Sequence, residues 1–341
     1  YEFLVAQIYG EKGSFKKMFT SYVQLLDKNM NYLATVQRYA SKYITEDKLN
    51  EKNIAFKKAL IKKSVSNPKD VWNTLLSWLF IQQKEYSKAF IQEKALFKRN
   101  PKNSSYILGL GRTSFENKAY ESSKTCFNFI IKNSSSKAEV LKAHLYRIKI
   151  AIAQNESDID AMFNTLYATY SKNIATIELQ LAQANYLTFI ENQPAQAIEI
   201  LEHALQIAPS KFQKAAIKIQ LGEVHVFTGN YNKALIYFSQ VQTGIKNHPL
   251  AQQARFKVAQ TSFFKNDFKW AFVQLKVLKS STTQLIANDA LDLFLTISDN
   301  QVKDSIDTGL KGYATASLLA FQNKNKQALD TLQYLITTFK G

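Results

Sequence analysis

The chain has 341 residues, more than one ordinary globular core holds, so composition argues against a single compact domain. Its one cysteine, Cys126, excludes a disulfide framework, and no apolar run approaches the ~20 residues of a membrane-spanning helix. The formal net charge is +17, which raises the question of an acidic partner.

Apolar residues at helical spacing begin at once. They predict a helix over 1–9 and, after a turn at Gly13, a partner helix over 18–26. Two further helices are expected over about 31–43 and 46–65, in poor register with any repeat. Few glycines and prolines interrupt the chain, which favours a helical protein without long linkers.

The segment 46–65 carries the densest group of basic residues in the chain: Lys57, Lys58, Lys62 and Lys63. They surround an apolar stripe formed by Ile54, Ala55, Ala59, Leu60 and Ile61. Such a helix can touch a membrane surface, or it can be an exposed face with buried lysine stems. We favour the exposed face and treat the four lysines as a candidate partner-binding site.

A better helix pair follows the break at Asn67-Pro68, over 71–82 and 86–97. The next helix contains Gly109-Leu110-Gly111, which lacks the strand and third glycine of a nucleotide site. We attribute both glycines to close helix crossing. Cys126 is expected to be a small buried side chain and not a reactive thiol. Helices over 138–153 and 159–170 complete this part.

The clearest periodicity lies between residues 178 and 278. Ala197, Ala234 and Ala271 are spaced 37 residues apart, and each opens the second helix of a predicted pair. Leu221-Gly222 precedes the middle alanine and Phe238 follows it. Turns are expected at Gly229-Asn230 and Asn266-Asp267. This is a partial match to the tetratricopeptide pattern, in which stacked helix pairs bury one another's apolar faces.

After residue 279 the repeat phase shifts. An additional helix is expected over 284–297, ended by Asp299-Asn300, and a last pair over 310–321 and 327–339. We therefore predict an all-α fold, a right-handed α-solenoid of stacked antiparallel helix pairs. It divides into 1–66, irregular and basic, 67–177 with repeat-like pairs, 178–279 with the best repeats and 280–341 with the extra helix and last pair. All four segments are expected to form one continuous solenoid.

Three longer runs carry a narrower resemblance: LSWLFIQQKEYSKAFIQ (76–92), IYFSQVQTGIKNHPLAQQARFKVAQTSFFKNDFKWA (236–271) and AFVQLKVLKSSTTQLIANDALDLFLTISDN (271–300). The chain resembles a tetratricopeptide protein family of Bacteroidetes bacteria. Members look like cell-envelope proteins, so the resemblance implies a periplasmic or envelope location, with the cytoplasm as the alternative. Because 1–9 already resembles a repeat helix, we expect the natural chain to begin earlier.

The sequence shows no constellation for catalysis. The four histidines form no zinc-binding pair, and there is no nucleophile elbow, phosphate loop or calcium loop. His225 stands where the repeat has an aromatic residue and is expected to pack. We predict no enzyme activity, no cofactor, no metal and no small-molecule substrate.

Binding is the better-supported hypothesis, because the first helices of stacked pairs line a groove. The repeat register gives these groove candidates: Arg112, Phe115, Tyr186, Phe189, Glu223, Phe256, Gln260 and Phe263. The alternative for each aromatic is a place in the core between repeats. We predict a non-catalytic scaffold that binds a partner protein or extended peptide, as part of a larger assembly.

Charge offers a second possibility. Residues 1–150 hold 27 Lys and Arg against 12 Asp and Glu, a net of +15, whereas residues 151–341 hold 17 against 15, a net of +2. This asymmetry predicts an acidic partner for the first part, or a nucleic-acid-binding solenoid. Only five of the basic residues are Arg, the type that phosphate recognition favours, so nucleic acid is the weaker alternative.

Overall fold

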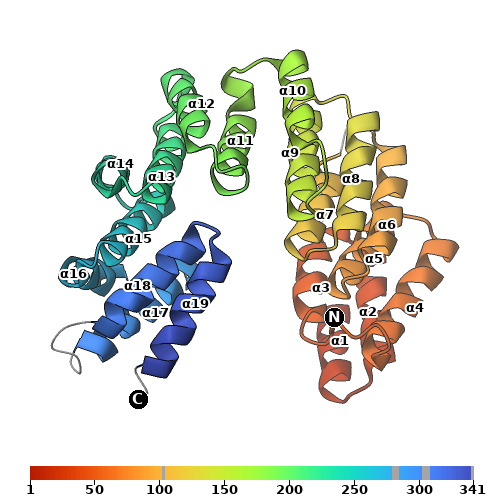
Figure 1. The fold of residues 1–341 in the computed structure, drawn as a ribbon. Helices are drawn as coiled ribbons and strands as arrows, with labels where there is room; N and C mark the ends of the chain where they lie inside the picture. Colours follow the sequence, from red (N-terminus) through yellow and green to blue (C-terminus); the bar gives the residue numbers. More distant parts are fainter. Residues whose placement is uncertain (102–103, 279–283, 302–307, 339–341) are drawn as a thin grey trace. The chain divides into compact units, whose positions relative to one another are not determined.

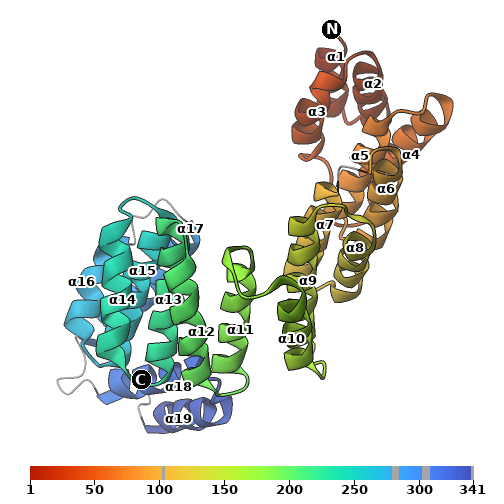
Figure 2. The ribbon, with the colours of Figure 1, turned by 90° about the horizontal axis from the view of Figure 1, so that it is seen from above.

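The computed structural model describes residues 1–101, 104–278, 284–301 and 308–338. These residues form α-helices joined by short turns, and no strand occurs among them. The chain divides into two compact units, unit 1 over residues 1–159 and unit 2 over residues 160–341 (Figures 1 and 2).

Unit 1 contains nine α-helices among its described residues and one short 3-10 helix. Their bounds are α1 (Glu2–Glu11), α2 (Phe15–Lys28), η1 (Met30–Tyr32), α3 (Leu33–Ala40), α4 (Glu51–Ser66), α5 (Asp70–Gln82), α6 (Tyr86–Arg99), α7 (Ser105–Glu116), α8 (Tyr120–Asn133) and α9 (Lys137–Ala153).

Unit 2 follows the same plan, and its first helix begins at the last residue of unit 1. Its elements are α10 (Ile159–Tyr170), η2 (Ile174–Thr176), α11 (Ile177–Phe189), α12 (Pro194–Ile207), α13 (Lys211–Phe227), α14 (Tyr231–Gly244), α15 (Pro249–Phe264), α16 (Phe268–Leu278), α17 (Gln284–Gln301), α18 (Thr308–Phe321) and α19 (Asn325–Thr338).

Consecutive helices pack as pairs. In unit 1 the pairs are α1 with α2, α5 with α6 and α7 with α8; in unit 2 they are α11 with α12, α13 with α14, α15 with α16 and α18 with α19. The first helices also contact one another, α11 with α13 and α13 with α15. This stacking confirms the predicted all-α class of helix pairs. No helix in the described part of the chain combines the length and apolarity that crossing a bilayer requires.

The turns inside the pairs share one backbone feature. Each contains a residue with positive φ: Gly13, Lys84, Lys118, Asn192, Gly229, Asn266 and Asn323. Glycine adopts this left-handed conformation without a Cβ clash, and asparagine tolerates it better than most residues. The turns expected at Gly229-Asn230 and Asn266-Asp267 are confirmed, since α14 and α16 begin directly after them.

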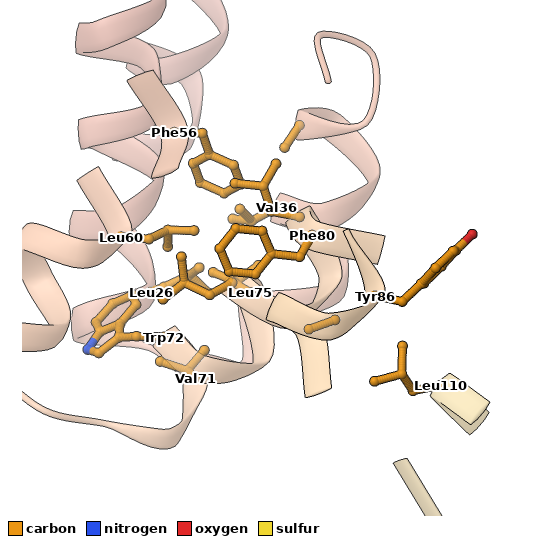
Figure 3. Packing of buried hydrophobic residues seen from close by; sticks show 14 of the residues in the cluster. Leu26, Val36, Phe56, Leu60, Val71, Trp72, Leu75, Phe80, Tyr86 and Leu110 are labelled. Atoms are coloured by element: carbon orange, nitrogen blue, oxygen red, sulfur yellow. The ribbon is translucent and has the colours of Figure 1, made fainter. Parts of the chain in front are cut away.

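The core of unit 1 is built from large side chains that interleave between helices (Figure 3). Trp72 is fully buried, and its indole Nε1 donates to the backbone oxygen of Asn67 at 2.8 Å. The rings of Phe19 and Phe56 stack with centroids 4.6 Å apart. On α4, Phe56 is buried together with Ala55 and Leu60 of the predicted stripe, whereas Ile61 of that stripe is 46% exposed.

Small residues stand where helix backbones approach most closely. Ala197, Ala234 and Ala271 are fully buried, as the repeat predicted. On α13, a Cβ on Gly222 would lie 2.4 Å from the Phe238 ring, and on α7 a Cβ on Gly111 would lie 2.8 Å from the Phe127 ring. The prediction that Gly111 allows two helices to cross closely is therefore confirmed.

For Gly109 that explanation is wrong. A Cβ there would meet nothing within 4 Å. Two positions separated by two residues lie on different sides of a helix, so only one of them can face the partner helix.

Two predicted helix bounds also need correction. The segment from 46 to 50 is not helical, because the buried Asn53 side chain donates to the backbone oxygens of Thr45 and Asp47, both at 2.7 Å. Helix α4 starts only after Asn50, whose side chain accepts from the Lys52 amide at 2.9 Å. At the other end of the chain, α17 continues through Asp299-Asn300 to Gln301.

The two glycines of α7 provide a matched test of helix packing. We expect Gly111→Ala to lower the free energy of unfolding by about 1–3 kcal/mol, because the buried Phe127 ring must shift. Gly109→Ala should raise it by roughly 0.5–1 kcal/mol through helix propensity. Urea unfolding followed by circular dichroism measures both. Equal effects of the two substitutions would contradict this packing.

Candidate interaction surface

The first helices of the central pairs form one side of unit 2, which we call the inner face: α11, α13 and α15. The C-terminal pair α18 and α19 folds back onto this side, and α18 contacts α15 (Figures 1 and 2). Its turn is held by two side chains. Gln322 Nε2 donates to the backbone oxygen of Phe227 at 2.8 Å, and Asn323 Nδ2 donates to that of Phe189 at 2.7 Å.

These two hydrogen bonds pair backbone carbonyl groups in the last turns of α13 and α11, which have no partner within their own helix. Aromatic rings extend the contact. The Phe321 ring lies edge-on to Phe189 at 5.4 Å and tilted to Phe264 at 5.9 Å, measured between ring centroids. Tyr313 lies edge-on to Phe263 at 6.2 Å. The chain's own C-terminal pair therefore covers part of the groove that the repeat pattern predicts.

An open pocket of about 450 Å³ remains beside this contact, between α15, α17 and α18. We call it the inner-face pocket. Its lining combines aromatic, acidic and neutral polar residues: Phe256, Gln260, Phe263, Phe264, Asp289, Asp292, Leu293, Thr296, Tyr313, Ser317 and Phe321. Partly exposed aromatic rings beside polar groups are typical of surfaces that bind peptides and proteins.

A charged pair borders the pocket. Lys257 Nζ lies 2.8 Å from a carboxylate oxygen of Glu223, and both side chains are largely buried, with 18% and 20% of their surfaces exposed. The same ammonium group donates to Gln260 Oε1 at 3.3 Å and lies 5.8 Å from the centroid of the Phe321 ring. Lys257 is thus already neutralised by Glu223 and held against the aromatic wall.

The structure brings three of the predicted groove residues together, since Phe256, Gln260 and Phe263 all line the inner-face pocket. Phe263 is only 1% exposed, so it supports the pocket wall from within the core. Phe189 lies between Phe227 and Phe321, where α18 covers it. Glu223 lies at the border of the pocket in its pair with Lys257.

Tyr186 lies in the core and not on the inner face. It is 6% exposed, and its hydroxyl donates to Glu191 Oε1 at 2.5 Å. Burial, together with the Glu191 carboxylate, raises the pKa of this phenol. The repeat register predicts which residues face the groove, but a helix that is packed on several sides also buries aromatic residues at those positions. Tyr186 is such a residue.

The remaining two groove candidates belong to α7 in unit 1. Arg112 is exposed. Phe115 is half-buried and packs edge-on against Tyr146 and tilted against Tyr120, with centroid distances of 5.6 Å and 5.9 Å. Phe115 is therefore largely engaged in packing between neighbouring helices.

The basic group on α4 is not uniform. Lys58 and Lys62 are exposed and Lys57 is half-buried. Lys63 instead lies 2.5 Å from the Asp27 carboxylate, which also accepts from Lys69 at 2.7 Å. Hydrogen bonds from Lys63 and Lys69 lower the pKa of Asp27. Lys63 therefore helps to join α4 to α2, and three lysines remain for a partner.

Two buried titratable residues, Cys126 and His225, contribute to packing. Burial raises the pKa of the Cys126 thiol to about 12, so this buried cysteine is not a thiolate near neutral pH. His225 is buried and stacks on Tyr237 with ring centroids 5.7 Å apart, and burial lowers its pKa. In the described residues, no group of three His, Cys, Asp or Glu side chains is placed to hold a metal ion.

Sequence reasoning missed the residues that α17 and α18 contribute to the pocket. They are Asp289, Asp292, Leu293, Thr296, Tyr313, Ser317 and Phe321. The phase shift after residue 279 predicted an extra helix but not where it packs. Asp289 and Asp292 are three residues apart, so they share a face of α17, and this spacing was the available signal.

Comparisons with known proteins support the fold. No protein-family model matches the chain, and no curated protein matches it by sequence. A tetratricopeptide repeat protein from Parabacteroides merdae is 12% identical, with a TM-score of 0.51 and alignment over 80% of this chain and 98% of that one. A human IFIT1 dimer with m7Gppp-AAAA is 11% identical, with a TM-score of 0.50 over 98% and 89% of the two chains.

A third solved structure, the APC/C hetero-tetramer Cut9-Hcn1, is 16% identical with a TM-score of 0.43, over 98% of this chain and 75% of that one. At these identities the first two likenesses establish the fold alone. The chain has a fold like that of tetratricopeptide repeat proteins.

The turn of the C-terminal pair can be tested separately from its apolar contacts. We expect Gln322→Ala with Asn323→Gly to speed amide exchange in α18 and α19 by roughly thirtyfold, because two hydrogen bonds worth ~1 kcal/mol each are lost. Glycine at 323 keeps the positive φ of 57° without strain. Hydrogen exchange read by mass spectrometry is the measurement. The exposed residue Gln333 of α19 provides the control, as Gln333→Ala should leave exchange unchanged.

Proposed function

We propose that the chain is a non-catalytic scaffold that binds a partner protein or an extended peptide, as part of a larger assembly. The observation that carries the proposal is the inner-face pocket. It presents Tyr313 with 42% of its surface exposed, beside the half-buried rings of Phe256 and Phe321. Exposed aromatic residues at the centre of a concave surface are the usual anchors of protein interfaces.

The tetratricopeptide-like fold supports the same role, because stacked helix pairs offer extended binding surfaces. The packing of α18 against α15 narrows the available surface to the pocket and its borders. This favours an extended segment of the partner over a bulky helix. A small-molecule substrate is not part of the proposal.

Nucleic acid is the second candidate. One observation favours it, the net charge of +15 in residues 1–150. The human IFIT1 structure, which contains m7Gppp-AAAA, shows that a protein with a similar fold binds RNA. Salt titration with a single-stranded RNA oligomer separates the two, since phosphate contacts cause a steep loss of affinity as salt rises.

For location, we propose the periplasm or cell envelope. The support is the resemblance of 76–92, 236–271 and 271–300 to a Bacteroidetes envelope family. The cytoplasm is the alternative, and fractionation of the native cells distinguishes the two.

The scaffold proposal predicts that the pocket captures the partner. With the full chain immobilised in an extract of the native cells, we expect wild type to recover a specific protein and Tyr313→Ala to lose it. Loss of an aromatic anchor costs about 2 kcal/mol or more in an interface. The measurement is mass spectrometry of the captured proteins.

Tyr334→Ala is the matched control, because Tyr334 is also in unit 2, on α19, and is 65% exposed. It should capture the partner as wild type does. Equal loss with both variants, or capture of nucleic acid without protein, would contradict the proposal.

An acidic partner for unit 1 gives a separate prediction. We expect Lys57→Glu, Lys58→Glu and Lys62→Glu together to slow association with the captured partner on the order of tenfold, through lost electrostatic steering. Thermal stability should change little, since Lys58 and Lys62 are exposed and none of the three forms an ion pair with a described residue. Stopped-flow kinetics at two salt concentrations measures the effect. Lys63 is left in place because its pair with Asp27 is structural.

The control is three reversals in α13, Lys211→Glu, Lys214→Glu and Lys218→Glu, with the same change in net charge. They should affect the rate less. If both sets slow association equally, total charge and not the α4 lysines governs the encounter.

A further inference from the structure

The inner-face pocket differs in charge from the rest of the chain. The protein carries a net charge of +17, yet the residues that line this pocket include two carboxylates and no Lys, Arg or His. Asp289 and Asp292 are both exposed on α17. Neither forms an ion pair with any other residue that the structure describes. The pocket is therefore locally negative.

The other two helices of the pocket contribute aromatic rings to its lining. Phe256, Phe263 and Phe264 come from α15, and Tyr313 and Phe321 come from α18. The ring contacts between Phe263 and Tyr313 and between Phe264 and Phe321 hold the aromatic wall in place. Because the face of an aromatic ring carries partial negative charge, it attracts cations within about 6 Å of its centroid.

The structure already shows a cation against this wall. Lys257 Nζ lies 5.8 Å from the Phe321 ring centroid, with Glu223 as its counter-ion at 2.8 Å. This internal arrangement combines a cation, an aromatic ring and a carboxylate. Asp289, Asp292 and Tyr313 are exposed lining residues that offer the same chemistry, and no basic side chain of the lining supplies the cation.

We propose that the inner-face pocket binds cationic side chains of a basic peptide segment in the partner. The inference rests on the scaffold function above and adds the chemistry of the ligand. A guanidinium or ammonium group pairs with Asp289 and Asp292 while its alkyl stem and charged plane pack on Tyr313. Gln260, Thr296 and Ser317 provide neutral polar groups for the peptide backbone.

The test uses the full chain and a fluorescent peptide of defined sequence, Gly-Arg-Gly-Arg-Gly. Its match is the same peptide with citrulline, which is neutral and nearly isosteric, in place of arginine. Fluorescence anisotropy should give at least about tenfold tighter binding of the arginine peptide, as expected for hydrogen bonds to charged groups. Asp289→Asn with Asp292→Asn should remove most of that preference, with helix content and melting temperature unchanged.

Glu199→Gln with Asp330→Asn is the control variant. It makes the same change in net charge at two exposed positions on α12 and α19 outside the pocket. It should bind the arginine peptide as wild type does. The proposal is overturned if both double variants weaken binding equally, if neither does, or if the citrulline peptide binds as tightly.

Partner capture separates this inference from the scaffold function. If Asp289→Asn with Asp292→Asn leaves the affinity of a captured partner unchanged, the basic-segment proposal fails and the scaffold role stands. If no partner is captured by wild type, the scaffold role fails, and the peptide titration still decides whether the pocket binds cations.

Discussion

The fold depends on how closely two helices of a stack can approach. On α13 the position of Gly222 leaves room for the Phe238 ring, which a Cβ would meet at 2.4 Å. The fully buried Ala234 and Ala271 keep the same approach in successive pairs. Each pair can bury its apolar side only against the next pair, so the close approach of helices is repeated along the unit. This repetition places the first helices of successive pairs, α11, α13 and α15, on the inner face.

The pair α18 and α19 meets the same need to bury apolar side chains by packing on the inner face of the central pairs. In unit 2, α18 contacts α15, and Phe321 packs on Phe189 and Phe264. The inner-face pocket is the space that this folding leaves open. Its walls come from the central repeats and from the terminal pair together.

Local structure was largely predictable from the sequence. Turn residues such as Gly229 and Asn266 marked the helix starts, and the 37-residue spacing of the small residues identified the helix pairs. Both features involve helices that are adjacent in the chain, so they recur in the sequence as a periodic pattern. The division of the chain into 1–66, 67–177, 178–279 and 280–341 stays a prediction, as does its continuity as one solenoid.

Contacts between distant segments could not be predicted in this way. The hydrogen bond from Asn323 to Phe189 joins residues 134 positions apart, and no repeat encodes it. The buried Asn53 is a similar case, because its amide replaces helical hydrogen bonds around Thr45 and Asp47. The sequence does not distinguish Lys63 from its neighbours on α4, because its partner Asp27 lies on a different helix, α2.

Net charge is an equally limited guide to the pocket. Residues 151–341 carry only +2, a near balance in which the carboxylates of Asp289 and Asp292 do not stand out. At physiological salt, charges more than about 8 Å apart in solvent are largely screened. A basic segment in the pocket is therefore governed by Asp289, Asp292 and the nearby rings, and much less by the surplus of lysines elsewhere. Under the proposal, selectivity for a basic segment comes from the short-range contacts of the pocket.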